Sequence, residues 1–96
     1  MNYPIALHKD THSAYGVTVP DLPGCYSAGA SLEEAVVMAE EAIQCHLEGL
    51  LRDGDPIPQP RALEEHQLNP DFQKAAWGLI LVDPSKIFGV LLPNNG

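Results

Sequence analysis

The residues of this chain that could catalyse a reaction are first of all its carboxylates. Hydrolysis with two metal ions needs several carboxylates that converge on ions about 4 Å apart. Asp10, Asp83 and the glutamates of residues 31–53 are the candidates. The expected first strand, residues 3–8, carries no carboxylate, and the glutamates are expected on the helix face that points away from the sheet. Because the set is incomplete, the sequence predicts no metal site and no cofactor.

Histidines and cysteines are the other reactive side chains. His46 falls on the apolar side of an expected helix, which predicts a histidine in the core or at its boundary, with a catalytic role as the alternative. His8 and His12 flank an expected turn and are predicted to be exposed, with a metal contact as the alternative. Cys25 has no predicted base beside it, and Cys45 is expected to act as a small hydrophobic residue. Neither cysteine has zinc-finger spacing. These patterns favour a protein that is not an enzyme.

One long helix positions most of these residues. Ser31 and Glu34 form a capping box that predicts its start, and Gly54 followed by Pro56 predicts its end. Successive residues of an α-helix are rotated by about 100°, and on this basis one side of residues 31–53 is an apolar stripe that can pack against a core. The stripe consists of Leu32, Ala35, Val36, Ala39, Ala42, Ile43, His46, Leu47 and Leu50. The opposite side is acidic and carries Glu33, Glu34, Glu40, Glu41 and Glu48.

Two apolar residues, Val37 and Leu51, fall on the acidic side of this helix. Contact with water explains why charged residues lie on an outer helix face, but it does not explain why two apolar residues lie there. We therefore expect a partner protein or a second copy of the chain to cover Val37 and Leu51.

Apolar alternation predicts strands at 3–8 and 15–19, which form a hairpin, and a short strand at 25–28. The run 76–82 is apolar throughout, as is typical of a strand buried on both faces in the interior of a sheet. The order β-β-β-α-β predicts an α+β fold with sheet order 3-2-1-4 and the long helix on one face. Strand four is expected to pair parallel to strand one after a right-handed crossover.

The connections between these elements are rich in proline. Residues 20–24 (Pro-Asp-Leu-Pro-Gly) predict a rigid loop with Leu22 at its tip, because each proline fixes its φ and Gly24 can adopt a positive φ. Prolines at every second position of 56–60 predict an extended arm, followed by a short helix at 62–68.

The 96 residues have the size of one domain and a formal charge of −8. The lysines and arginines are scattered, whereas nucleic-acid binding needs them clustered. We expect no direct nucleic-acid ligand and a basic protein as partner, with solubility as the alternative reason for the acidity. Neither a membrane-spanning run nor a signal-peptide pattern is found, so a cytoplasmic location with free thiols is expected. The open face of a small sheet predicts a homo-oligomer, a dimer or higher.

Several motifs together resemble the HicB family of antitoxins. They are Tyr-Pro-Ile-Ala at 3–6, Gly-Val-Thr-Val-Pro-Asp-Leu-Pro-Gly-Cys at 16–25, Ser-Ala-Gly at 27–29, Glu-Glu-Ala at 33–35, Gly-Asp-Pro-Ile-Pro-Gln-Pro at 54–60 and Trp-Gly-Leu-Ile-Leu-Val-Asp-Pro-Ser-Lys at 77–86. The resemblance covers residues 1–86 as one HicB-like domain and implies a partial RNase H-like fold. It also implies that the chain binds and neutralises HicA, a small basic toxin that cleaves mRNA. Residues 87–96 depart from the family, whose members usually continue into a DNA-binding domain, so this tail is expected to bind no operator.

The toxin contacts that this function would need fall on two parts of the chain. Asp21, Leu22 and Pro23 are the candidates in the loop. The candidates for steering and masking on the helix are Glu33, Glu40, Glu41 and Glu48, although a solvated helix face explains them equally well. The alternative function is a divergent metal-dependent RNase H-like nuclease that uses Asp10, Asp83 and a helix glutamate.

Overall fold

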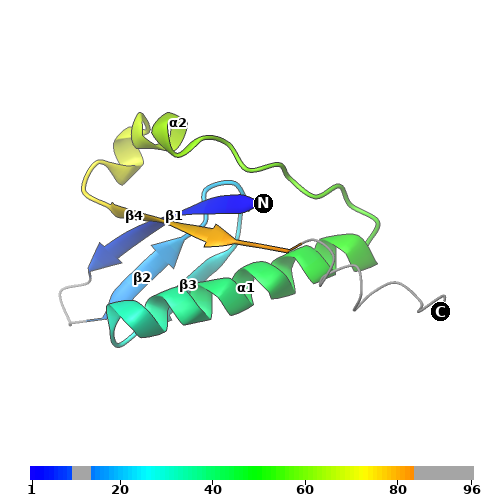
Figure 1. The fold of residues 1–96 in the computed structure, drawn as a ribbon, viewed down its shortest axis with the longest axis horizontal. Helices are drawn as coiled ribbons and strands as arrows, with labels where there is room; N and C mark the ends of the chain where they lie inside the picture. The colour runs from blue at the N-terminus through cyan, green and yellow to red at the C-terminus, as the bar shows by residue number, and fades with distance from the viewer. Residues whose placement is uncertain (10–13, 84–96) are drawn as a thin grey trace.

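The computed structural model describes residues 1–9 and 14–83. Its elements follow in the order β1 (Asn2–Lys9), β2 (Tyr15–Thr18), β3 (Tyr26–Gly29), α1 (Leu32–Arg52), α2 (Leu63–Gln67), the 3-10 helix η1 (Pro70–Phe72) and β4 (Ala76–Leu81). The four strands form one sheet in the order β3-β2-β1-β4, and α1 packs along one face (Figure 1). The predicted α+β fold, its sheet order and its single long helix are confirmed.

The direction of β4 differs from the prediction. β4 pairs antiparallel to β1, with Tyr3 opposite Ile80 and Leu7 opposite Ala76, so the expected parallel pairing is wrong. The reason is visible in Figure 1: after α1 the chain runs back along the whole sheet through the arm and α2, and then enters β4 from the far end. The right-handed crossover rule concerns parallel strands and therefore does not apply here.

The position of β4 also differs from the prediction. β4 lies at an edge of the sheet, and Leu79 and Leu81 are 57% and 72% exposed, so the expected interior strand is wrong. A continuous apolar run has the same appearance in a buried strand and in an edge strand with an uncovered outer face, because periodicity does not report on neighbours.

The helix α1 begins and ends close to the predicted residues. The Ser31 hydroxyl accepts a hydrogen bond from the Glu34 N–H at 3.1 Å, which confirms the capping box, and Gly54 has a φ of +77°. The buried side consists of Ala35, Ala39, Ile43 and Leu47. Leu32, which the stripe predicted to be buried, is 48% exposed because it lies in the first turn.

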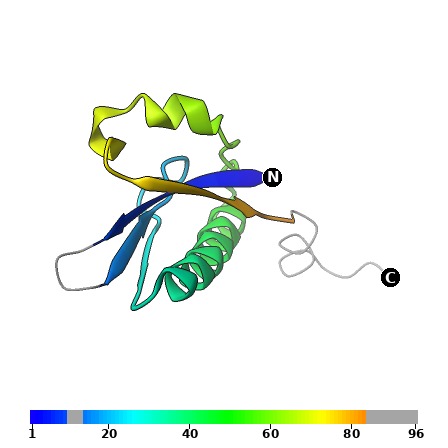
Figure 2. The same ribbon diagram turned by 60° about the vertical axis from the view of Figure 1, so that its left-hand side comes forward.

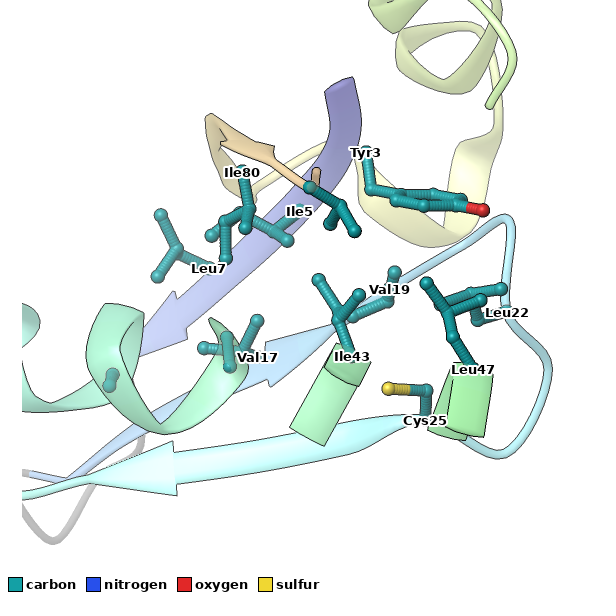
Figure 3. Close-up of a cluster of buried hydrophobic side chains, with 13 residues drawn as sticks. Tyr3, Ile5, Leu7, Val17, Val19, Leu22, Cys25, Ile43, Leu47 and Ile80 are labelled. Atoms are coloured by element: carbon teal, nitrogen blue, oxygen red, sulfur yellow. The ribbon is translucent and has the colours of Figure 1, made fainter. Parts of the chain in front are cut away.

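The core lies between α1 and the face of the sheet that carries Tyr3, Ile5 and Leu7. Figure 3 shows Ile43 and Leu47 of α1 directed toward these strand residues. Pro4 and Ala6, on the opposite face of β1, are also buried, since α2 and η1 lie over that side (Figure 2). The sheet therefore has one face that α1 covers over most of its area and one that is only partly covered.

Close contact between β3 and the start of α1 depends on Gly29. A Cβ at Gly29 would lie 2.4 Å from the backbone nitrogen of Ala35, so no larger residue fits without moving the helix. We expect Gly29→Ala to lower the free energy of unfolding by about 2–3 kcal/mol. Urea denaturation followed by circular dichroism measures this.

Gly49 provides the matched control, because a Cβ there meets nothing within 4 Å and the residue lies inside α1. Gly49→Ala should raise the stability by about 0.5–1 kcal/mol through helix propensity. If the two substitutions change the stability equally, a side chain at position 29 is tolerated beside α1, and the close contact does not require glycine.

Candidate partner-binding surfaces

The loop between β2 and β3 is closed by its own backbone hydrogen bonds. The Leu22 N–H donates to the Val19 carbonyl at 3.0 Å, the Cys25 N–H to the Leu22 carbonyl at 3.0 Å, and the Val19 N–H to the Cys25 carbonyl at 3.2 Å. Gly24 has a φ of +85°, which a residue with a side chain rarely adopts. The predicted rigid loop is thus built from local turns.

The side chain of Leu22 points inward, so its predicted place at the loop tip is wrong. Leu22 is fully buried, and Figure 3 shows it beside Leu47 and near Cys25. The loop closes over an open end of the core, so the apolar side chain of Leu22 packs inside. This burial is favourable because it removes a large apolar side chain from water.

Asp21 is a buried anchor rather than a free surface charge. Its residue is 8% exposed. One carboxylate oxygen accepts the Arg61 backbone N–H at 3.1 Å, and the other lies 3.0 Å from Nε2 of His66. Both partners lie beyond α1 in the sequence, so Asp21 joins the loop to the arm and to α2. Buried carboxylates need such partners, because an unpaired one is costly.

Sequence reasoning missed His66 as a structural residue. It belongs to a five-residue helix without an amphipathic pattern, and nothing in its neighbourhood along the chain indicates a carboxylate partner. His66 also stacks on Trp77, with ring centroids 6.3 Å apart and planes at 16°, and Phe72 meets Trp77 edge-on at 5.6 Å. This aromatic cluster closes the sheet face behind Ala6.

The arm has a second anchor at Tyr3. The Tyr3 hydroxyl donates to the Pro58 carbonyl at 2.6 Å. Burial, and then the negative charge of Asp21, raise the pKa of the Tyr3 phenol above its ordinary value of 10.0. The phenol therefore stays protonated and can act as a donor throughout the physiological pH range.

Pro23 is the exposed member of the three loop candidates. It borders a shallow cleft of about 210 Å³ between the loop and η1. Residues that line the cleft include Thr18, Leu22, Pro23, Tyr26, Asn69 and Phe72. A partner that reaches this end of the molecule meets Pro23 and the 67% exposed Tyr26, whereas Asp21 and Leu22 set the shape of the loop from inside.

The outer side of α1 carries the acidic candidates. Glu33, Glu40 and Glu41 are exposed, and Glu48 is half-buried. Val37 is 54% exposed among them, as predicted, and the neighbouring Met38, which the sequence analysis did not single out, is 40% exposed. Leu51 is different: it is partly buried and packs against the core, so its predicted place on the outer acidic side is wrong.

The reactive side chains do not gather into a catalytic arrangement within the described chain. In residues 1–9 and 14–83, no group of three His, Cys, Asp or Glu residues could hold a metal ion. Asp10 and His12 lie outside the described residues, and His8 packs near the ring of Phe72 at 6.2 Å. Burial, and then the neighbouring Cys45, raise the pKa of the Cys25 thiol, which disfavours the thiolate.

Both cysteines are free thiols. Among the helices that the structure describes, none is long and apolar enough to cross a membrane.

Comparisons with known proteins match this chain to a family model and to individual relatives. The model of a "HicB_like antitoxin of bacterial toxin-antitoxin system" matches residues 3–91. An uncharacterized 14.9 kDa protein of Haemophilus phage HP1 is 38% identical over 89 residues, which are 93% of this chain and 66% of the phage protein. The chain thus spans just under two thirds of that relative.

Two solved structures are similar over most of this chain. The N-terminal domain of the Burkholderia pseudomallei antitoxin HicB is 42% identical, with a TM-score of 0.79 over 86% of this chain and 99% of that domain. A chain of a HicA3 and HicB3 toxin-antitoxin complex is 30% identical, with a TM-score of 0.75 over 88% of this chain and all of the other.

Removal of either member of the buried pair should destabilise the fold. We expect Asp21→Ala to lower the free energy of unfolding by about 3 kcal/mol, because the His66 ring and the Arg61 N–H lose their buried partner. His66→Ala should cost about 2–3 kcal/mol for the lost bond and stacking. The double variant should cost about 1–3 kcal/mol less than the sum, as measured by urea denaturation. Additive effects would contradict the coupling.

Tyr3→Phe tests the second anchor. It should cost about 1 kcal/mol at neutral pH, since the Pro58 carbonyl loses its donor. A raised pKa means that the folded state holds the phenol proton more tightly than the unfolded state. The native protein should therefore lose stability as pH rises through 10.0 and above, and Tyr3→Phe should lose less over the same range. Parallel pH–stability curves for the two proteins would count against this role.

Proposed function

The chain belongs to the HicB-like antitoxin family of bacterial toxin–antitoxin systems, and we propose on this basis that it binds and neutralises a small basic toxin of the HicA type that cleaves mRNA. Members of this family are antitoxins and not enzymes. A similar chain occurs in the complex of HicA3 with HicB3. Because binding of a toxin requires no catalytic group in the antitoxin, the scattered reactive residues fit this role.

The main structural support for this proposal is the exposed acidic side of α1. It presents Glu33, Glu40 and Glu41 to solvent, with Val37 and Met38 exposed between them. A toxin that binds RNA needs cationic groups for the phosphates. An acidic surface with an apolar centre complements such groups, steers the encounter and excludes water from the middle of the contact. The toxin's RNA-binding surface would thereby be masked.

The loop supplies a second proposed contact. Pro23 is exposed beside the cleft, while Asp21 and Leu22 hold the loop in shape through their burial. We assign Pro23 to direct contact with the toxin and Asp21 and Leu22 to positioning. A loop that is rigid before binding loses little entropy when the complex forms.

The remaining partners follow from charge and surface. With a net charge of −8 and scattered basic residues, the chain is proposed to bind no nucleic acid directly. A site of action in the cytoplasm, where mRNA is translated, fits the toxin's substrate. The exposed apolar residues of β4 support self-association as a homo-oligomer.

Co-purification with the basic protein encoded next to this chain tests the proposal. A stable complex in which that partner no longer cleaves RNA is the expected result. A folded, active partner that does not bind, or that binds and still cleaves, would overturn the antitoxin function.

Charge reversal on α1 tests where the toxin binds. Glu40→Lys with Glu41→Lys should slow association at least about tenfold at low salt and reduce its salt dependence, because the steering charges are reversed. Glu64→Lys with Asp71→Lys, at two exposed residues of α2 and η1, changes the net charge equally and should have a much smaller effect. Stopped-flow or surface plasmon resonance measures the rates. Equal slowing in both variants would show that only the total charge matters.

Val37→Gln tests the apolar centre without a change of charge. It should raise the dissociation rate about five- to tenfold while the protein remains as helical as the original, because Val37 is exposed in the free chain. An unchanged dissociation rate would remove Val37 from the contact.

A further inference from the structure

Among residues 1–9 and 14–83, no strand pairs with the outer edge of β4, which presents its backbone groups in a regular order. Met1 and Val82 exchange two hydrogen bonds, of 2.9 Å and 2.7 Å. In an antiparallel ladder such pairs alternate along the strands, so Ile80 and Gly78 also direct their N–H and C=O groups toward β1. The N–H and C=O groups of the residues between them therefore point to the free edge. These residues are Trp77, Leu79 and Leu81.

The side chains of the same residues lie on the partly covered face of the sheet. Trp77 is opposite Ala6, Leu79 opposite Pro4 and Leu81 opposite Asn2, which places all three on the face away from α1. Trp77 is half-buried under His66 and Phe72, whereas Leu79 and Leu81 are both exposed. An apolar strip thus follows the unpaired edge.

Within the part of the chain that the structure describes, β4 lacks the usual protections of an edge strand. Natural edge strands are short, or carry Lys, Pro or a bulge. β4 has six residues, Ala-Trp-Gly-Leu-Ile-Leu, with none of these residues, and its register with β1 is continuous. The opposite edge, β3, has four residues and leads within two residues into the cap of α1. An unprotected edge indicates a partner strand.

We propose that two copies of the chain pair through β4, antiparallel and around a two-fold axis at Leu79, to form one continuous sheet. Leu79 then lies opposite Leu79 of the partner subunit, and Trp77 lies opposite Leu81 of the partner subunit. Every outward N–H and C=O group of these residues meets its counterpart. The leucines of both subunits and the edge of each Trp77 ring join into one apolar strip. This proposal specifies the surface for the self-association proposed above and does not depend on toxin binding.

Charge favours a second copy over a basic toxin as the occupant of this edge. Two chains of net charge −8 repel each other over most of their surface, and residues 76–82 carry no charge. A basic toxin is attracted instead to the glutamates of α1, which packs over β2 and β3 at the other side of the sheet. In the proposed dimer both acidic helices remain free, so the two interfaces are compatible.

Charge substitutions at Leu79 test the proposal in the full chain, with sedimentation equilibrium as the measurement. The unchanged protein should form a dimer. Leu79→Lys alone and Leu79→Glu alone should each weaken the dimer at least tenfold, because the two-fold axis places like charges opposite each other. An equimolar mixture of the two variants should restore dimers, since a lysine then faces a glutamate. Leu68→Lys, at an 84% exposed leucine outside β4, is the matched control and should leave the dimer unchanged.

The outcomes separate this proposal from the others. A monomer at all accessible concentrations would overturn both self-association and the β4 interface. If both single variants still form dimers, or if their mixture does not form dimers, the two-fold pairing through β4 is overturned. Self-association of the unchanged protein would remain. If Leu79→Lys abolishes toxin binding but leaves the dimer unchanged, the β4 edge binds the toxin, and the β4 dimer proposal is overturned as well.

Discussion

One buried carboxylate, Asp21, ties the loop between β2 and β3 to the part of the chain that follows α1. After α1, the arm crosses the molecule without joining any strand, and two polar anchors fix it: Asp21, through the Arg61 N–H and His66, and the Tyr3 hydroxyl, through the Pro58 carbonyl. Together with Ile57, which packs against the core, these anchors hold the arm beside the sheet up to the start of α2. With α2 in this position, η1 and the aromatic cluster lie over one sheet face, and the chain enters β4 opposite in direction to β1. The loop residue Asp21 thus joins parts of the chain that lie far apart in the sequence.

This topology separates two kinds of surface. The long helix shields the core with small and aliphatic residues and turns an acidic side outward, where a basic protein can be attracted over a distance. The return of the chain leaves β4 at the far edge, uncharged and with two exposed leucines. Electrostatic attraction suits an encounter with a partner of opposite charge, whereas strand pairing with apolar contacts suits an identical, equally acidic chain. The proposed interfaces therefore use different forces and do not compete for the same residues.

The errors of the sequence analysis have a common origin in contacts between distant residues. Leu22 looked like a loop tip because proline and glycine define a turn, but not whether the turn closes over the core. Leu51 falls on the outer side of an ideal helical wheel, yet it packs against the core near the end of α1. Among the loop candidates, the sequence could not distinguish the exposed Pro23 from its two buried neighbours, because all three belong to the same motif.

The sequence by itself determined the elements whose signals are local. Capping residues and a stripe of period 3.6 defined α1, and alternation defined the first hairpin. The apolar run predicted a fourth strand, and the order of the elements placed it beside the first strand, in the sheet order 3-2-1-4. Only the tertiary structure decided the direction and the edge position of β4, the burial of Asp21 and Leu22, and the pairing of Asp21 with His66. Residues so far apart meet through the path of the arm, and that path is set by the sum of many contacts rather than by any pattern along the chain.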